Sequence, residues 1–152
     1  MELRCGAAVT VGVGLFAAAA LAGEPSFQLD PFGQATHDSA VCPVVKPPLL
    51  TEDEMRTEAH VRVERGTYYA LEGTSEPGGA YRRDREFNAE VIAAISADPR
   101  FRNTSVWVTT CRGWVMLEGC VRSYGQRKAL VAFVKKQPNA VQVFYSLTRL
   151  TK

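Results

Sequence analysis

The clearest alternation of apolar and polar positions in this chain runs over residues 106–121. Apolar residues alternate on both sides of Arg112-Gly113, a dipeptide suited to a tight reversal, so the segment predicts a β-hairpin. The pairs that face each other on this register are Thr110 with Val115, Val108 with Leu117, and Val106 with Gly119, and they form the predicted inward face. The opposite face then carries Trp107, Cys111, Trp114, Met116 and Cys120, which is unusually apolar for a surface.

Helical patterns lie on both sides of this hairpin. Asp84 is expected to cap a helix that ends before Asp98-Pro99, with an apolar stripe of Phe87, Val91, Ala94 and Ile95. Ser123 and Gln126 have capping-box spacing and open a second helix, whose inward residues are Ala129, Leu130, Phe133 and Val134.

A third strand is predicted from Ala140 to Leu150, after Gln137-Pro138-Asn139 ends the second helix. Its pattern consists of Val141, Val143, Tyr145 and Leu147. The order over residues 84–150 is therefore helix, strand, strand, helix, strand. We expect a small α+β domain with a three-stranded sheet and two helices on one face.

Residues 51–83 are predicted to form an acidic helix and a connector outside that domain. Thr51 and Glu54 make a capping box, so a helix is expected from Glu52 to about Arg65, ended by Gly66. The connector carries Tyr68, Tyr69 and Leu71, which we expect to dock on the domain. Residues 61–73 also echo the hairpin with one extra residue after Arg-Gly. A decayed repeat and a coincidence are both open interpretations.

Residues 1–22 have the features of a secretory signal peptide. Cys5 to Ala22 contains no charge, and Ala20-Leu21-Ala22 supplies a small-x-small cleavage pattern, which predicts cutting before Gly23. An uncleaved membrane anchor is the alternative, because the apolar run has about the ~18 residues at which a span becomes a candidate. Residues 23–50 are interrupted by prolines and lack periodicity. They are expected to form a leader with little structure of its own.

The net charge of +2 hides an asymmetry between two parts of the chain. Residues 23–84 hold 6 Lys and Arg against 11 Asp and Glu, whereas residues 85–152 hold 11 against 4. The first part therefore carries −5 and the second +7. A basic module favours an anionic partner, which could be lipid headgroups, nucleic acid or its own acidic neighbour. Export disfavours nucleic acid.

Export to an oxidising compartment raises the question of disulfides among Cys42, Cys111 and Cys120. Cys111 and Cys120 share a hairpin face but lie about six residues apart along it, or roughly 20 Å, which exceeds disulfide reach. A bridge must join Cys42 to Cys111 or Cys120, or be intermolecular. The alternative is that Cys111 and Cys120 are small apolar fillers. No Cys-x-x-Cys pair is present, and no histidine is adjacent to a cysteine.

The ordered elements of residues 84–150 resemble the BON domain, a bacterial module. The family's two strands read approximately I-x-V-x-V-x-x-G-x-V-x-L-x-G-x-V. The residues that fill this register are Val106, Val108, Thr110, Gly113, Val115, Leu117, Gly119 and Val121. Asn139 stands where the family usually has a glycine, and only one copy of the module is clear. The resemblance implies a periplasmic, non-enzymatic module that binds phospholipid membranes or associates with envelope proteins. It transfers Gly113 and Gly119 as structural positions and offers no catalytic residues.

Two groups of residues are candidates for an interaction surface. Trp107, Trp114 and Met116 would form an apolar patch, unless Tyr68, Tyr69 or the helix over 52–65 covers that face. Basic residues that could attract anionic headgroups are Arg100, Arg102, Arg112, Arg127, Lys128, Lys135 and Lys136. Their alternative role is a solvated, partly neutralised helix face.

Three hypotheses about function follow. The first is a periplasmic protein that binds anionic phospholipid surfaces. The second is an envelope adaptor that docks another protein on the apolar hairpin face. The third is a thiol-dependent enzyme, which would require a reactive cysteine. We expect no enzyme, because no carboxylate pair, Gly-rich phosphate loop or Gly-x-Ser-x-Gly motif is apparent. No cofactor or metal is expected either.

Overall fold

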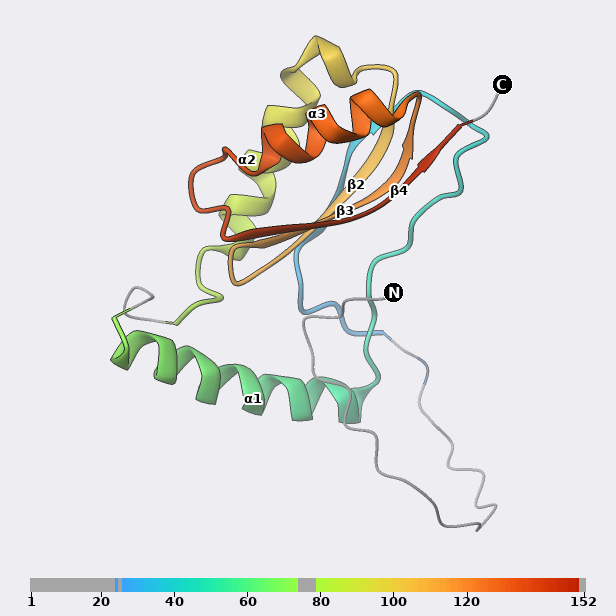
Figure 1. Cartoon of the computed structure of the whole chain (residues 1–152). Helices are drawn as coiled ribbons and strands as arrows, with labels where there is room; N and C mark the ends of the chain where they lie inside the picture. Colours follow the sequence, from blue (N-terminus) through green and yellow to red (C-terminus); the bar gives the residue numbers. More distant parts are fainter. Residues whose placement is uncertain (1–23, 25, 74–78, 151–152) are drawn as a thin grey trace, which may run out of the picture.

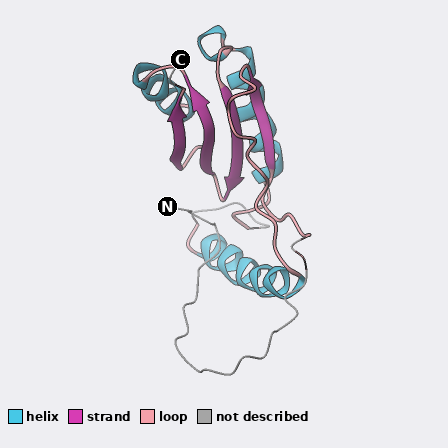
Figure 2. Ribbon diagram, turned by 90° about the vertical axis from the view of Figure 1, so that its right-hand side faces the viewer, coloured by secondary structure: helices cyan, strands magenta, loops and turns pink. Residues whose placement is uncertain are grey.

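A computed structural model describes residues 24, 26–73 and 79–150 of the chain. The predicted signal peptide over residues 1–22 lies outside the described residues, and so does its alternative, an uncleaved membrane anchor. The described part is an α+β structure in which α2 and α3 cover one face of a sheet, while α1 lies apart from the sheet (Figure 1). Figure 2 gives the same separation from the side.

The sheet has four strands in the order β1-β2-β3-β4. β1 is Phe32–His37, β2 is Ser105–Cys111, β3 is Trp114–Val121 and β4 is Gln142–Arg149. β1 pairs antiparallel with β2 and β2 antiparallel with β3, whereas β4 runs parallel to β3. The α+β class is confirmed, and the sheet is mixed.

The predicted hairpin register is confirmed. Thr110 faces Val115, Val108 faces Leu117, and Val106 faces Gly119. Arg112 and Gly113 have φ values of 56° and 72° and form the turn. Positive φ at both turn residues matches the right-handed twist of the flanking strands, which is why such turns close two-residue hairpins.

The three predicted strands are present as β2, β3 and β4, but the sheet has a fourth, so the expectation of a three-stranded sheet was wrong. The expectation of a leader with little structure over residues 23–50 was wrong as well. β1 lies within that leader and supplies the edge strand beside β2. Its sequence shows little alternation because Gly33 and Ala35 occupy the inward side. A Cβ on Gly33 would lie 2.6 Å from Cδ1 of Ile92, so α2 leaves no room there for a larger residue.

The inward face of the sheet and the two covering helices form the main core. α2 is Asp84–Ala97 and α3 is Tyr124–Val134, with a short 3₁₀ helix at Pro99–Phe101 between α2 and β2. The core residues with no exposed surface are Val91, Ile95, Phe101, Val106, Val108, Val115, Leu117, Leu130 and Val134. The predicted stripes of both helices contribute, although Ala94, Ala129 and Phe133 are only partly buried. Burial of such side chains contributes about 1.5–3 kcal/mol each relative to exposure.

α1 is Glu52–Leu71, longer than predicted. The Thr51–Glu54 capping box is present, but Gly66 does not end the helix. Gly66 is buried where α1 meets the connector, and a Cβ there would lie 3.3 Å from Cα of Gly79. Glycine therefore serves a close backbone approach at this position. Because residues 61–71 are helical, their echo of the hairpin does not correspond to a second hairpin.

One further expectation was wrong in detail. Asp84 is the first residue of α2 and not its cap; Arg83 holds the N-cap position, without a side-chain hydrogen bond. The predicted third strand is present as β4, in which Val143 and Leu147 are buried and Tyr145 is 50% exposed. α3 therefore covers only part of the face of this edge strand.

Candidate interaction surface

Exposed tyrosines and arginines gather where the N-terminal part of α3 lies beside β4. Tyr124 is 55% exposed and Tyr145 50% exposed. The Arg127 guanidinium carbon lies 4.8 Å from the Tyr124 ring centroid and 5.5 Å from that of Tyr145. Arg149 lies 5.1 Å from the Tyr124 centroid. We call Tyr124, Arg127, Tyr145 and Arg149 the aromatic–basic cluster.

Local sequence explains why the cluster forms. The Ser123 hydroxyl accepts a hydrogen bond from the Gln126 backbone N–H and fixes the start of α3, which places Tyr124 and Arg127 one turn apart on the same side. Cation–π contact with the rings holds the guanidinium groups against an aromatic surface, while both remain open to solvent. The cluster therefore presents positive charge and amphipathic rings together.

Three lysines on α3 and directly after it extend the positive charge away from the cluster. Lys128, Lys135 and Lys136 are exposed, and within the described residues none of them has an acidic partner at ion-pair distance. Lys135 is eleven residues beyond Tyr124, or about 16 Å along the helix. Of the predicted basic residues, Arg127 and Lys128 therefore lie on α3, whereas Lys135 and Lys136 follow its last residue, Val134.

The outer face of the sheet, opposite the helices, is partly covered by the segment that follows β1. Cys42 forms a disulfide with Cys120, one of the two bridges that the sequence left open for Cys42. Trp107, 5% exposed, packs with this disulfide. Phe32, Val45 and Leu150 complete the cluster. The cover expected from Tyr68, Tyr69 or the 52–65 helix comes instead from this segment.

Trp107 is therefore not a surface residue, but Trp114 and Met116 remain half-buried on the same face. The Trp114 ring lies edge-on to Phe144 at 5.5 Å, and Arg112 lies 4.3 Å from its centroid. The structure separates the predicted surface into two parts. Arg112, Trp114 and Met116 belong to the hairpin, whereas Arg127 and Lys128 lie on α3, and Lys135 and Lys136 directly follow that helix.

The hairpin turn is held by the carboxylate of Asp84, which was expected to cap a helix. Asp84, 4% exposed, accepts hydrogen bonds from the backbone N–H groups of Arg112 at 2.8 Å and Gly113 at 3.1 Å. Burial raises the pKa of Asp84, and these two hydrogen bonds oppose the shift. Arg112 also donates to the Tyr69 hydroxyl at 3.1 Å, which joins the end of α1 to the turn. Tyr68 and Leu71, by contrast, are 59% and 83% exposed.

Gly113 and Gly119 are structural positions. A Cβ on Gly113 would lie 2.7 Å from the Asn139 carbonyl oxygen, and one on Gly119 would lie 2.1 Å from that of Ser105. Both glycines have positive φ, at 72° and 116°. The close approach of neighbouring backbone therefore excludes any side chain.

No cysteine in the described part of the chain is a free thiol. Cys42 and Cys120 are joined, and Cys111 is 3% exposed. The interpretation of Cys111 and Cys120 as apolar fillers was therefore wrong. The described residues also contain no group of three or more His, Cys, Asp or Glu side chains arranged to hold a metal ion.

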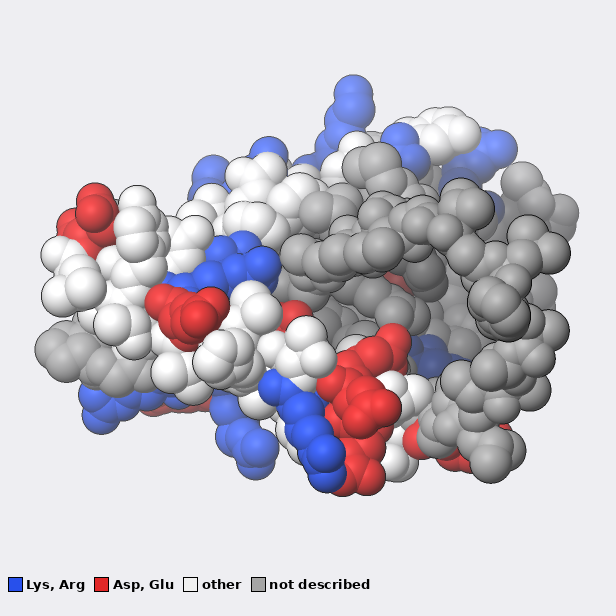
Figure 3. All heavy atoms as spheres, turned by 90° about the horizontal axis from the view of Figure 1, so that it is seen from below, with Lys and Arg blue, Asp and Glu red and all other residues white. Residues whose placement is uncertain are grey.

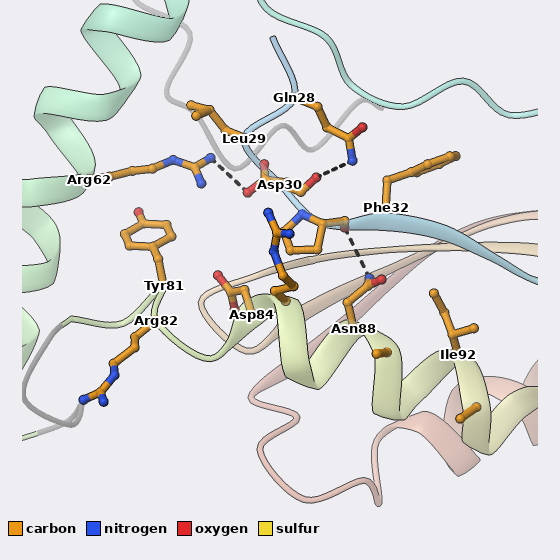
Figure 4. Close-up of a pocket in the computed structure, with 14 residues that line it drawn as sticks. Gln28, Leu29, Asp30, Phe32, Arg62, Tyr81, Arg82, Asp84, Asn88 and Ile92 are labelled. Atoms are coloured by element: carbon orange, nitrogen blue, oxygen red, sulfur yellow. Dashed lines mark hydrogen bonds and ion pairs between the residues drawn. The ribbon is translucent and has the colours of Figure 1, made fainter.

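A cavity of about 780 Å³ lies on the other side of the molecule, between residues 28–32, α1 and α2 (Figure 4). Arg62 reaches into it from α1, with Nη2 2.9 Å from Asp30 Oδ1 and Nε 3.2 Å from Glu58 Oε1. Its guanidinium also lies 4.8 Å from the Tyr81 centroid. Burial raises the pKa of Asp30, opposed by Arg62. This cavity could not be predicted from local sequence patterns, because its walls come from three separate segments.

The α1 side of the molecule differs in charge from the side that carries the aromatic–basic cluster. Figure 3 looks onto that side and shows acidic and basic side chains interspersed. Several of them pair locally, as Arg56 does with Glu52 and Arg62 with Glu58. None of the helices in the described ranges is long and apolar enough to cross a bilayer.

Comparison with known proteins supports one assignment. The family model of the BON domain matches residues 83–151. Neither curated proteins nor solved structures give a match to the chain.

Proposed function

Since residues 83–151 are a BON domain, we propose that this protein is an exported, periplasmic and non-enzymatic protein that binds anionic phospholipid surfaces of the cell envelope. BON domains are a family of non-catalytic binding domains associated with membranes or phospholipids. The single observation that carries the proposal for this chain is the aromatic–basic cluster on α3 and β4.

The chemistry of the cluster suits a lipid headgroup region. Tyrosine rings are amphipathic and favour the boundary between water and hydrocarbon, and arginine donors pair well with phosphate oxygens. Each basic residue near an anionic membrane contributes up to about 1 kcal/mol, and salt reduces this. Arg127, Arg149 and the lysines of α3 together would give reversible binding that depends on ionic strength.

The geometry favours contact by one side of the domain. Tyr124 and Tyr145 are each at least half exposed, and the arginines that lie over them make no ion pair within the described residues. The domain would therefore rest on the membrane with the N-terminal part of α3 and the adjoining edge of β4. The lysines further along α3 would contribute longer-range attraction.

An envelope adaptor is the second candidate, and the half-buried Trp114, Met116 and Phe144 favour it. These side chains share the outer face of the sheet beyond the part that the Cys42 segment covers. A protein partner could complete that cover. The membrane proposal and the adaptor proposal use opposite faces of the sheet, so substitutions distinguish them.

Liposome co-sedimentation of residues 23–152 tests the membrane proposal. We expect binding to vesicles with anionic lipid at low salt, weak binding to neutral vesicles, and a loss of several-fold when Tyr124 and Tyr145 are both changed to alanine. Arg56→Gln with Arg83→Gln is the matched control for a variant with Arg127→Gln and Arg149→Gln, because both remove two positive charges. Equal binding to anionic and neutral vesicles would reject the proposal. Capture of an envelope protein that is lost on Trp114→Ala would favour the adaptor.

A further inference from the structure

The two edges of the sheet differ in how they are protected against further strand pairing. β1 is the shorter edge strand, with six residues, and its register with β2 shifts between Gln34 and Thr36. β4 has eight residues and pairs with β3 in one unbroken register. It contains no proline or glycine, and its only charge is that of Arg149. Edge strands of natural proteins are usually short, bulged or charged, which prevents their backbone from pairing with another chain. β1 has such protection and β4 lacks it.

The outer edge of β4 is open to solvent. β3 is the only neighbour of β4 in the described sheet, so one row of β4 backbone N–H and C=O groups has no strand partner there. Gln142, Ser146 and Thr148 are exposed, and Tyr145 is 50% exposed. Because α3 covers only part of β4, the helix side above this edge is open as well. The described residues therefore leave room for a further strand beside β4.

The sequence of β4 is complementary to itself when two copies run antiparallel. In a register centred on Tyr145, Val143 of one copy lies opposite Leu147 of the other on the inner face. These are the two buried residues of β4, each 5% exposed, so the cores of the two copies would become continuous. The two Tyr145 side chains would meet at the centre. A register centred on Ser146 would instead place Val143 opposite Arg149, an apolar side chain against a charge.

The charges near β4 allow this pairing and make it depend on salt. The two Arg149 side chains would lie four residues on either side of the centre, about 26 Å apart, which exceeds the Debye length of ~8 Å at physiological salt. Arg127 lies 5.5 Å from the Tyr145 ring centroid, so the two Arg127 guanidinium groups would approach each other near the centre. Salt screens that repulsion. Association through β4 should therefore strengthen as ionic strength rises.

We propose that two copies of this chain pair through β4 and form a continuous eight-stranded sheet. The twofold axis of such an antiparallel pairing is perpendicular to the sheet, so the helices of both copies lie on the same side. Both aromatic–basic clusters then face the same direction beside the shared edge. Their use as one bivalent membrane surface rests on the proposed function, whereas the dimer itself does not.

Analytical ultracentrifugation of residues 23–152 without lipid tests the dimer. We expect a reversible equilibrium in which the dimer fraction rises with protein concentration and with salt. Ser146→Lys would place two like charges diagonally across the pairing, about 7–8 Å apart, and should weaken association at least tenfold. Gln34→Lys adds the same charge at an exposed position of β1 and should leave association unchanged. A monomer at every concentration would overturn the proposal, as would equal effects of the two variants.

Cysteine cross-linking tests the register. Residue 145 lies opposite its own copy with the Cα atoms about 4.5–5.5 Å apart, which is within disulfide reach, so Tyr145→Cys should form a covalent dimer on oxidation. Ser146→Cys, with its copies in the diagonal position, should cross-link at least tenfold more slowly. Cross-linking at 146 as fast as at 145 would overturn the proposed pairing. A chain that stays monomeric but binds anionic vesicles would reject the dimer alone, and a dimer that binds no vesicles would reject only the proposed function.

Discussion

The two faces of the sheet are closed in different ways. On the inner face, α2 and α3 of the BON domain bury a continuous aliphatic core, in which Val108, Val115 and Leu117 have no exposed surface. On the outer face, the cover comes from the segment around Cys42, which lies outside the residues that match the family. The inner face is therefore closed by helices of the domain itself, and β1 from outside the domain adds Ala35 to that core. The outer face depends on an added segment and a disulfide.

The difference between the covers of the two faces determines which residues are available for binding. Cover by the Cys42 segment removes Trp107 from the surface, although its sequence pattern suggests exposure as much as that of Trp114 does. The helix side, by contrast, retains exposed tyrosines, together with basic residues on α3 and β4 that make no ion pair within the described residues. The membrane proposal therefore rests on the helix side and not on the apolar hairpin face.

The inner core should give the largest effect on stability. Leu117→Ala removes a fully buried side chain beneath both helices and leaves a cavity. We expect a loss of roughly 3–5 kcal/mol in the free energy of unfolding, measured by urea denaturation. Met116→Ala, a half-buried position on the outer face of the same strand, is the control and should cost clearly less. Equal losses would contradict the distinction between the two faces.

Removal of the Cys42–Cys120 disulfide should have the next largest effect. The bridge closes a sequence separation of 78 residues, and the loss expected for Cys42→Ser with Cys120→Ser is about 2–4 kcal/mol. In a Trp114→Phe background, Trp107 fluorescence should shift to longer wavelength because its cover loosens. An unshifted spectrum would mean that the segment stays in place without the bridge.

The junction of α1 with the domain should show a smaller, pH-dependent effect. Burial raises the pKa of Asp30 above its unfolded value, so the native state binds a proton more readily than the unfolded chain. Stability from this group therefore increases as pH falls through the raised pKa and decreases as pH rises. We expect the unfolding free energy of the native sequence, relative to Asp30→Asn, to rise on acidification from pH 7 toward pH 4. A constant difference would contradict the assigned direction.

Single substitutions in the aromatic–basic cluster should change stability least. Arg127→Gln replaces a partly exposed side chain without an ion pair in the described residues, so the free energy of unfolding should change by no more than about 0.5 kcal/mol. Thermal and urea denaturation would both check this. A larger loss would show that the contacts of Arg127 with Tyr124 and Tyr145 support the fold.

Much of the BON domain could be predicted from sequence, because strong local signals agree there. The turn at Arg112-Gly113, the Ser123 cap and the aliphatic stripes each indicate the element that forms. β1 could not be predicted, since its inward side is Gly33 and Ala35 and its stability comes from pairing with a strand about seventy residues away. Tertiary contact likewise explains the continuation of α1 through Gly66.

The candidate site was predictable only in part. Arg127, Lys128, Lys135 and Lys136 follow from the helical pattern of α3, but Tyr124 and Tyr145 join them through the parallel placement of β4 beside β3. Tyr145 belongs to the predicted pattern of this strand, and its 50% exposure follows from the incomplete cover by α3. The cavity beside Arg62 requires three distant segments to meet, and no local pattern encodes that.

Vesicle binding by the aromatic–basic cluster tests the central claim most directly. Co-sedimentation of residues 23–152 should be strong with anionic vesicles at low salt. It should fall several-fold for Arg127→Gln with Arg149→Gln and remain unchanged for Arg56→Gln with Arg83→Gln. Equal loss in both double variants would attribute binding to net charge alone. Undiminished binding of the Arg127 and Arg149 variant would contradict the assignment of this surface.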